Sequence, residues 1–120
     1  MLKLLTLDDV VRYYRNPANV RAEMCRYKWP DGMKCECGST DFYPTRKPLL
    51  TCLNCKAKVS YLEGTFAERS SLSAAVWLAA IRIFGNPQLE TQPKVFAKRF
   101  GVSYPAVLRM LRKVRGWLSN

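Results

Sequence analysis

Apolar residues repeat at helical spacing in the first thirty positions of the chain. Between Leu7 and Tyr14, four apolar side chains fall on one side of a helix, and Thr6 stands before them as a candidate N-cap. A second helical pattern over residues 16–29 begins with a proline in its first turn and stops before the Pro-Asp-Gly turn of residues 30–32. The pattern therefore predicts two short helices before residue 33.

The middle of the chain changes to short segments rich in β-branched and aromatic residues. Residues 41–46, 48–54 and 57–62 have this composition and are broken by prolines and by a cysteine-containing turn, as expected of strands. Residues 72–84 then form a stretch that is apolar nearly all round, with Arg82 as its only charge. Such a pattern is typical of a buried helix.

The last thirty residues predict two more helices. Val95, Phe96 and Phe100 share one face of a short helix that ends at Gly101. Ser103 can cap a longer second helix. Two helices joined by a three- or four-residue turn that contains glycine predict a helix-turn-helix. The inward stripe of the second helix is expected to be Val107, Leu111, Val114 and Leu118.

Four of the five cysteines lie in two close pairs, spaced C-x-C and C-x-x-C with fourteen residues between them. The chain contains no histidine, so a tetrahedral metal site must use thiolates alone, as structural zinc sites commonly do. Residues i and i+2 of an extended segment point to the same face, so even the shorter pair can reach one ion. We therefore predict a zinc ribbon with one structural zinc ion. The predicted ligands are Cys35, Cys37, Cys52 and Cys55.

Other roles for the cysteines fit less well. A thioredoxin-like redox pair needs a βαβ pattern that the sequence lacks. Disulfides are disfavoured, because no signal-peptide pattern is visible and we expect a cytoplasmic protein, in which thiols stay reduced. The longest apolar run, from Leu72 to Ile81, is about half of the roughly 20 residues that span a bilayer. Cys25 is expected to fill the core, and it is the reserve ligand if Cys35 or Cys37 cannot reach the ion.

The charge distribution indicates a polyanionic partner. The formal net charge is +11, and residues 91–120 contribute seven Lys or Arg and no Asp or Glu. This block favours nucleic acid, with a membrane surface as the weaker alternative. In a helix-turn-helix the start of the second helix faces base edges, which assigns Ser103, Tyr104 and Arg109 to bases, with Arg109 the best candidate for a guanine. The phosphate candidates are Lys98, Arg112 and Lys113, and Lys94 completes the predicted DNA-binding set.

Five segments, taken in order, resemble one known family. They are WPDG, CECGS, TCLNC, LEGTFAERSSLSAAVWLAAI and FAKRFGVSYPAVLRMLRKVR, and over roughly residues 7–118 they are similar to the N-terminal region of a group of bacterial insertion-sequence transposases. In that group a zinc ribbon and a helix-turn-helix precede a catalytic domain of the DDE type. The resemblance implies that the four paired cysteines are zinc ligands and that the helix from Ser103 binds DNA.

Two features differ from that family. The first cysteine pair is one residue shorter than the usual C-P-x-C-G, and this sequence ends at Asn120, where the family would begin its carboxylate triad. We also expect no enzymatic activity, because the nine acids are scattered, histidine is absent and no nucleophile or general base stands out.

We expect a small α+β fold in three consecutive segments: helical residues 1–32, a zinc ribbon over 33–66, and a linker helix with the helix-turn-helix over 67–120. The expected function is binding of double-stranded DNA by a transposase-derived, nucleoid-associated protein. Neither a membrane nor a small-molecule substrate is an expected partner. Further contacts to the DNA backbone are expected from basic residues of the ribbon, namely Arg46, Lys47, Lys56 and Lys58.

Two alternatives stay open at this point. The chain can be an adaptor or accessory subunit that docks through its zinc ribbon on a larger nuclease, transposase or ribonucleoprotein complex. Exposed Trp29, Tyr43 or Tyr61 would favour this role. The chain can also be a fragment of a full transposase.

Overall fold

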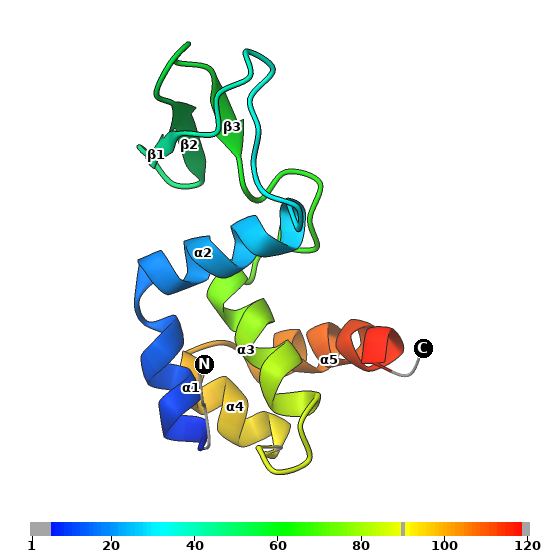
Figure 1. The fold of residues 1–120 in the computed structure, drawn as a ribbon. Coiled ribbons are helices and arrows are strands. Elements are labelled where there is room, and N and C mark those ends of the chain that lie inside the picture. Colours follow the sequence, from blue (N-terminus) through cyan, green and yellow to red (C-terminus); the bar gives the residue numbers. More distant parts are fainter. Residues whose placement is uncertain (1–5, 90, 119–120) are drawn as a thin grey trace. The chain divides into compact units, whose positions relative to one another are not determined.

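The computed structural model describes residues 6–89 and 91–118 of the chain. Within these ranges the protein has five α-helices and one three-stranded antiparallel sheet, which confirms the expected α+β class (Figure 1). The helices are α1 (Leu7–Tyr14), α2 (Pro17–Lys28), α3 (Ala74–Phe84), α4 (Pro93–Phe100) and α5 (Tyr104–Leu118). The strands are β1 (Phe42–Pro44), β2 (Leu49–Cys52) and β3 (Lys58–Ser60).

The chain forms two compact units. The helical unit comprises the described residues up to Val20 and from Ser71 onward, and the sheet unit spans Arg21–Ser70. This division differs from the three consecutive segments expected from the sequence, with boundaries after residues 32 and 66. The reason is that α1 packs against α3, which is distant in the sequence, whereas most of α2 belongs with the sheet.

Helix α1 carries the N-terminal cap that its sequence predicts. The Thr6 hydroxyl accepts a hydrogen bond from the Asp9 amide at 3.1 Å, and the Asp9 carboxylate accepts one from the Thr6 amide at 3.2 Å. This capping box pairs two amide groups that would otherwise lack partners. The buried Tyr14 hydroxyl accepts a hydrogen bond from Arg82 of α3 at 3.0 Å. The apolar stripe of α1 is thereby fixed against α3.

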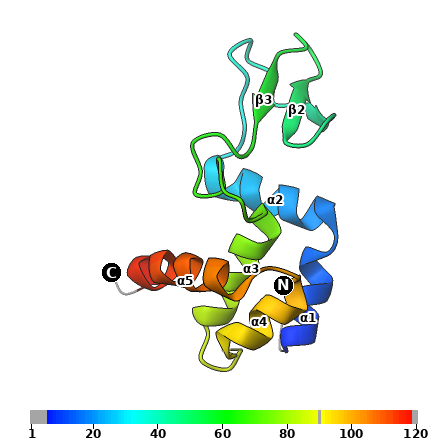
Figure 2. The same ribbon diagram turned by 180° about the vertical axis from the view of Figure 1, so that it is seen from behind.

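Helix α3 is buried, as predicted. The Ser73 hydroxyl caps its first turn by accepting a hydrogen bond from the Val76 amide at 3.4 Å. Seven of its eleven residues are buried, and it lies between α1 and α5 in both views of the fold (Figures 1 and 2). Ile83 has no exposed surface, so its burial contributes about 1.5–3 kcal/mol. The helix needs no polar face because its neighbours cover it on two sides.

A tight turn joins α4 to α5. Gly101 has φ = +66°, a left-handed conformation that costs free energy for any residue with a Cβ. The Val102 amide donates to the Ala97 carbonyl at 3.0 Å, which closes the end of α4. Ser103 then caps α5, because its hydroxyl accepts a hydrogen bond from the Ala106 amide at 3.3 Å. The predicted helix end at Gly101 and the predicted cap at Ser103 are both confirmed.

One face of α5 is buried along most of its length. Three of the four predicted inward residues belong to this face, but the prediction is wrong for Leu118, whose side chain is 45% exposed. Leu118 is the last residue of the helix and lies beside Gly85 at the end of α3, so α3 does not extend far enough to cover it. The buried residues of α5 are Ala106, Val107, Met110, Leu111 and Val114.

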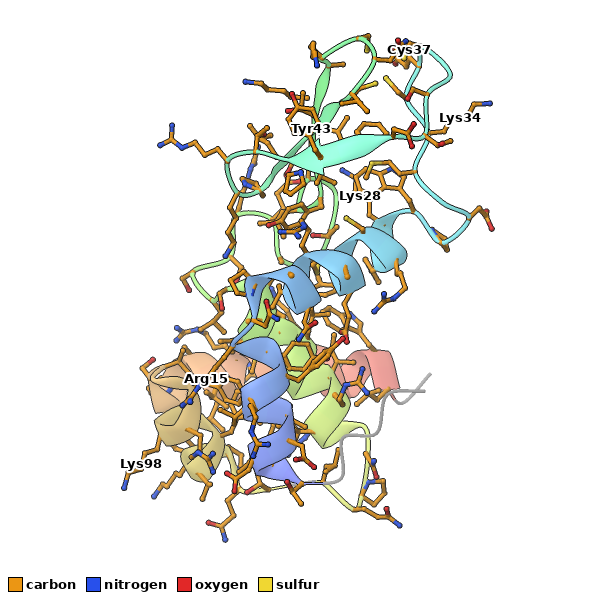
Figure 3. All side chains as sticks on the ribbon, turned by 60° about the vertical axis from the view of Figure 1, so that its left-hand side comes forward. Arg15, Lys28, Lys34, Cys37, Tyr43 and Lys98 are labelled. Atoms are coloured by element: carbon orange, nitrogen blue, oxygen red, sulfur yellow. The ribbon has the colours of Figure 1, made fainter. Side chains whose placement is uncertain are left out.

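The sheet has the order β1-β2-β3, and both neighbouring pairs are antiparallel. Its strands fall within the three segments predicted from the sequence, which are confirmed. The central strand β2 supplies the buried residues Leu50, Thr51 and Cys52. The Lys28 ammonium group at the end of α2 donates to the Ser60 carbonyl of β3 at 2.6 Å, which ties this helix to the sheet (Figure 3).

Candidate metal centre and basic helix pair

Two backbone turns bring the four paired cysteines together. In the first turn the Gly38 amide donates to the Cys35 carbonyl at 2.9 Å, and Gly38 reverses the chain after Cys37 with φ = +96°. In the second turn, which follows β2, the Lys56 amide donates to the Cys52 carbonyl at 3.0 Å. Each pair of cysteines is therefore held by a hydrogen-bonded loop. Cys37 lies in the loop that precedes β1 (Figure 3).

The four sulfur atoms form a compact cluster. The sulfurs of Cys35 and Cys55 lie 3.5 Å apart, those of Cys37 and Cys52 lie 3.7 Å apart, and all four lie within 4.8 Å of one another. Sulfurs at about 2.3 Å from one tetrahedral zinc ion are roughly 3.7 Å apart, whereas a disulfide bond is about 2.05 Å long. The cluster therefore has the spacing of a four-thiolate metal site, and its cysteines are free thiols. Both cysteines of the short C-x-C pair reach this site.

The proton affinities of the thiols differ within the cluster. A hydrogen bond from the Cys55 backbone amide lowers the pKa of Cys52 to about 6, although burial opposes it. The pKa of Cys35 is raised to about 12: a hydrogen bond from the Cys37 amide lowers it, but the thiol of Cys55 and burial outweigh that bond. Four negative charges this close are unfavourable without a cation, and a bound metal ion deprotonates the thiols that coordinate it. The donor set therefore fits a divalent cation.

Asn54 links the two cysteine loops. Its side-chain amide donates a hydrogen bond of 3.5 Å to the Cys37 sulfur, which lowers the pKa of that thiol. Groups that donate to a metal-bound sulfur orient the ligand and stabilise its charge. Cys25 lies outside the cluster on α2, where it is half-buried rather than fully buried as expected. The four paired cysteines complete the site without this reserve ligand.

The residues predicted to bind DNA are all exposed, and they come from α4, α5 and the turn between these helices. Lys98 projects outward from α4 (Figure 3). At about 100° per residue, Arg109 and Arg112 fall on the side of α5 opposite to its buried face, and Lys113 lies at the edge of that side. No described carboxylate forms an ion pair with these three side chains. The exposed side of α5 therefore carries uncompensated positive charge. The complete predicted set is Lys94, Lys98, Ser103, Tyr104, Arg109, Arg112 and Lys113.

Four further side chains at this surface already have partners within the protein. The Ser103 hydroxyl accepts the capping hydrogen bond from the Ala106 amide, although its own proton can still be donated. The Lys94 ammonium group lies 5.5 Å from the centre of the Tyr104 ring, a cation–π distance. Arg99, which the predicted set omits, pairs with the Asp8 carboxylate of α1.

Leu108 belongs to the same exposed side of α5, and the predicted set omits it as well. Its side chain is 42% exposed, although leucine is an apolar residue in a strongly basic surface. Leu108 precedes Arg112 by four residues, so the two side chains are neighbours on the helix surface. The helical period of the sequence could have revealed the exposure of Leu108, because this residue lies outside the predicted inward stripe.

The sheet unit exposes a second, smaller set of groups. The ammonium group of Lys56 lies 5.5 Å from the centre of the Tyr43 ring, and Tyr43 is 36% exposed (Figure 3). Exposure of Trp29, Tyr43 or Tyr61 would favour the adaptor role. Trp29 is half-buried and Tyr61 is buried, so of these three residues only Tyr43 is exposed. Leu53, in the turn between the second pair of cysteines, is 56% exposed. All four basic residues named for the ribbon are exposed, namely Arg46, Lys47, Lys56 and Lys58.

Comparison with known proteins identifies no relative of this chain. No protein-family model matches the chain, and no curated protein or solved structure shows significant similarity to it. The resemblance to insertion-sequence transposases therefore stays a prediction. Among the described helices, none combines the length and the apolar character that crossing a membrane requires.

Proposed function

We propose that this protein binds double-stranded DNA without catalysing a reaction, through a helix-turn-helix made of α4 and α5. The observation that carries the proposal is the two-sided character of α5. One side is buried against the rest of the helical unit, and the exposed surface presents Arg109, Arg112 and Lys113 with no described carboxylate paired to them. A nucleic acid supplies the missing negative charge at regular spacing.

The connection between the two helices supports the same proposal. A short helix, a turn with glycine in the left-handed conformation and a longer capped helix are the parts of a helix-turn-helix. In that motif α5 enters the major groove with its first turns at the base edges. Arg109 then approaches a guanine, while Lys98, Arg112 and Lys113 approach phosphates.

We further propose that the metal ion is a single structural zinc, held by the four paired cysteines. A closed four-thiolate site of this spacing suits zinc, because no position is left for water or substrate. When bound, the ion contributes folding free energy to the sheet unit. The cysteine loops position the sulfurs, and the Asn54 amide orients the Cys37 sulfur through its hydrogen bond.

The origin and location of the protein belong to the same proposal. The sequence resemblance supports derivation from a transposase, and binding to duplex DNA would place the protein at the nucleoid in the cytoplasm. A role as a repressor of a related element, or as a targeting subunit, follows from DNA binding without catalysis.

The test is selection of bound DNA from a random duplex pool by the zinc-loaded full chain at near-physiological salt. We expect one enriched motif. R109A should lose the enrichment, whereas R26A should keep it, because Arg26 is an exposed arginine on α2 in the sheet unit. Absence of any duplex binding by the wild-type protein would overturn the proposal.

A second candidate function is favoured by the exposed side chains of the sheet unit. Leu53 and Tyr43 offer apolar surface beside the metal site, as an adaptor that docks on a larger nuclease, transposase or ribonucleoprotein complex would require. Pull-down from the native host separates the two functions. Stable recovery of one such complex, lost in L53A but kept in R109A, would favour the adaptor.

A further inference from the structure

An apolar strip runs through the basic side of α5. Tyr104 is 37% exposed in the first turn, and Leu108 is 42% exposed one turn later. Arg112 follows Leu108 by one more turn, and Arg109 directly follows Leu108 in the sequence. The strip therefore lies within the surface that carries the proposed DNA contacts.

Leu108 does not belong to the buried core of the helical unit. The buried face of α5 is already filled from Ala106 to Val114, and Leu108 lies about 130° from its centre at about 100° per residue. Helix propensity does not account for a leucine at this position, because lysine, glutamate and glutamine favour helix about as well as leucine. The exposed part of the side chain is therefore available for a contact outside the protein.

The chemistry of the major groove offers one apolar partner. Its base edges present hydrogen-bond donors and acceptors, and the only apolar group among them is the C5-methyl group of thymine. We propose that Leu108 contacts a thymine methyl group and so makes the protein select thymine at a fixed position of its site. This inference rests on the proposed function, since it places α5 in the major groove.

The helix geometry sets where that thymine lies. Successive residues of an α-helix lie about 1.5 Å apart along its axis, which is less than half of a base-pair step of about 3.4 Å. Arg109 is adjacent to Leu108 in the sequence. A guanine read by Arg109 should therefore lie within about two base pairs of the selected thymine.

The experiment replaces thymine by deoxyuridine, which pairs identically and lacks only the methyl group. Duplexes enriched from the random pool are resynthesised with each thymine replaced singly, and the zinc-loaded full chain is titrated against each. At one or two positions we expect about fourfold weaker binding by the wild-type protein, the value of one apolar methyl group removed from water. At the remaining thymines the replacement should change nothing.

Two variants assign the effect to the side chain. L108A should bind the thymine and deoxyuridine duplexes equally, because the methyl group has lost its partner. L53A makes the same substitution at an exposed leucine of the sheet unit and should keep the discrimination. Both positions are exposed, so both variants should retain the wild-type circular dichroism spectrum.

The outcomes separate this inference from the proposed function. A wild-type protein that selects a motif but ignores the methyl groups overturns the role of Leu108 and leaves DNA binding intact. If L108A still discriminates between the thymine and deoxyuridine duplexes, the role of Leu108 is likewise overturned and DNA binding is left intact. Failure of the wild-type protein to bind any duplex overturns the proposed function, and with it this inference.

Discussion

Replacing Cys52 by serine tests the metal centre most sharply. Cys52 has no exposed surface, ends β2, and is fixed by hydrogen bonds from its own amide to the Ala57 carbonyl at 2.8 Å and from the Lys56 amide to its carbonyl at 3.0 Å. Its sulfur cannot be replaced by a neighbouring ligand, because Cys25 lies outside the cluster. C52S therefore leaves three thiolates and no fourth protein ligand of equal strength.

The size of the effect follows from the number of ligands. A structural zinc site binds its ion with about 10–16 kcal/mol, so one of four equal thiolates is worth roughly 3 kcal/mol. At about 1.4 kcal/mol per factor of ten, the zinc affinity of C52S should fall at least about a hundredfold. Because the metal and the fold of the sheet unit are coupled, hydrogen-exchange protection should be lost in β2 and β3 and kept in α3.

The assay is competition for zinc against a chelator of known affinity, with native mass spectrometry to count bound ions. We expect one zinc ion per wild-type chain. C25S is the matched control, since it removes a thiol outside the cluster, and its zinc affinity should equal that of the wild-type protein. An unchanged affinity in C52S, or an equal loss in C25S, would refute the four-ligand site.

Two further predictions concern the helical unit, each measured by chemical denaturation followed with circular dichroism. F96A should lower the free energy of unfolding by about 3–5 kcal/mol, because Phe96 has no exposed surface and its ring lies 4.5 Å from that of Phe100 between centroids; a loss as small as that of the exposed control V95A would contradict this packing. G101A should destabilise by about 1 kcal/mol, because Gly101 has φ = +66°. The same substitution in G116A should stabilise by about 0.5–1 kcal/mol, because a Cβ there meets nothing within 4 Å and the backbone is helical. If G101A and G116A changed the free energy of unfolding in the same direction, the left-handed conformation of Gly101 would be contradicted.

Local signals in the sequence predicted the helix boundaries and the four cysteines that cluster in the structure. The cap at Thr6, the helix end at Gly101 and the cap at Ser103 depend on residues within four positions of one another, so a short stretch of sequence determines them. The metal site is predictable for a related reason. Two cysteines one or two residues apart can direct their sulfur atoms to the same point. The spacing of the cysteines was therefore enough to predict that Cys35 and Cys37 lie in one cluster with the second pair.

Features that depend on packing between distant segments were not predictable. The pairing of α1 with α3 joins segments about sixty residues apart and divides the chain differently from the segments expected. The exposure of Leu118 depends on where α3 ends, which the period of α5 cannot reveal. Tyr43 is 36% exposed and Tyr61 only 5%, a difference that the short β-rich segments around them did not reveal in the sequence.

The salt dependence of duplex binding shows whether the exposed side of α5 contacts the DNA backbone. Affinity of the zinc-loaded full chain is measured at a series of salt concentrations for the wild-type protein, R112A and R26A. Each phosphate contact adds about 0.9 to the slope of log affinity against log salt. We predict a steep slope for the wild-type protein, a slope smaller by about 1 for R112A, and no change for R26A. A wild-type affinity that is the same at low and high salt, or an R112A slope equal to the wild-type slope, would contradict binding of DNA through the exposed side of α5.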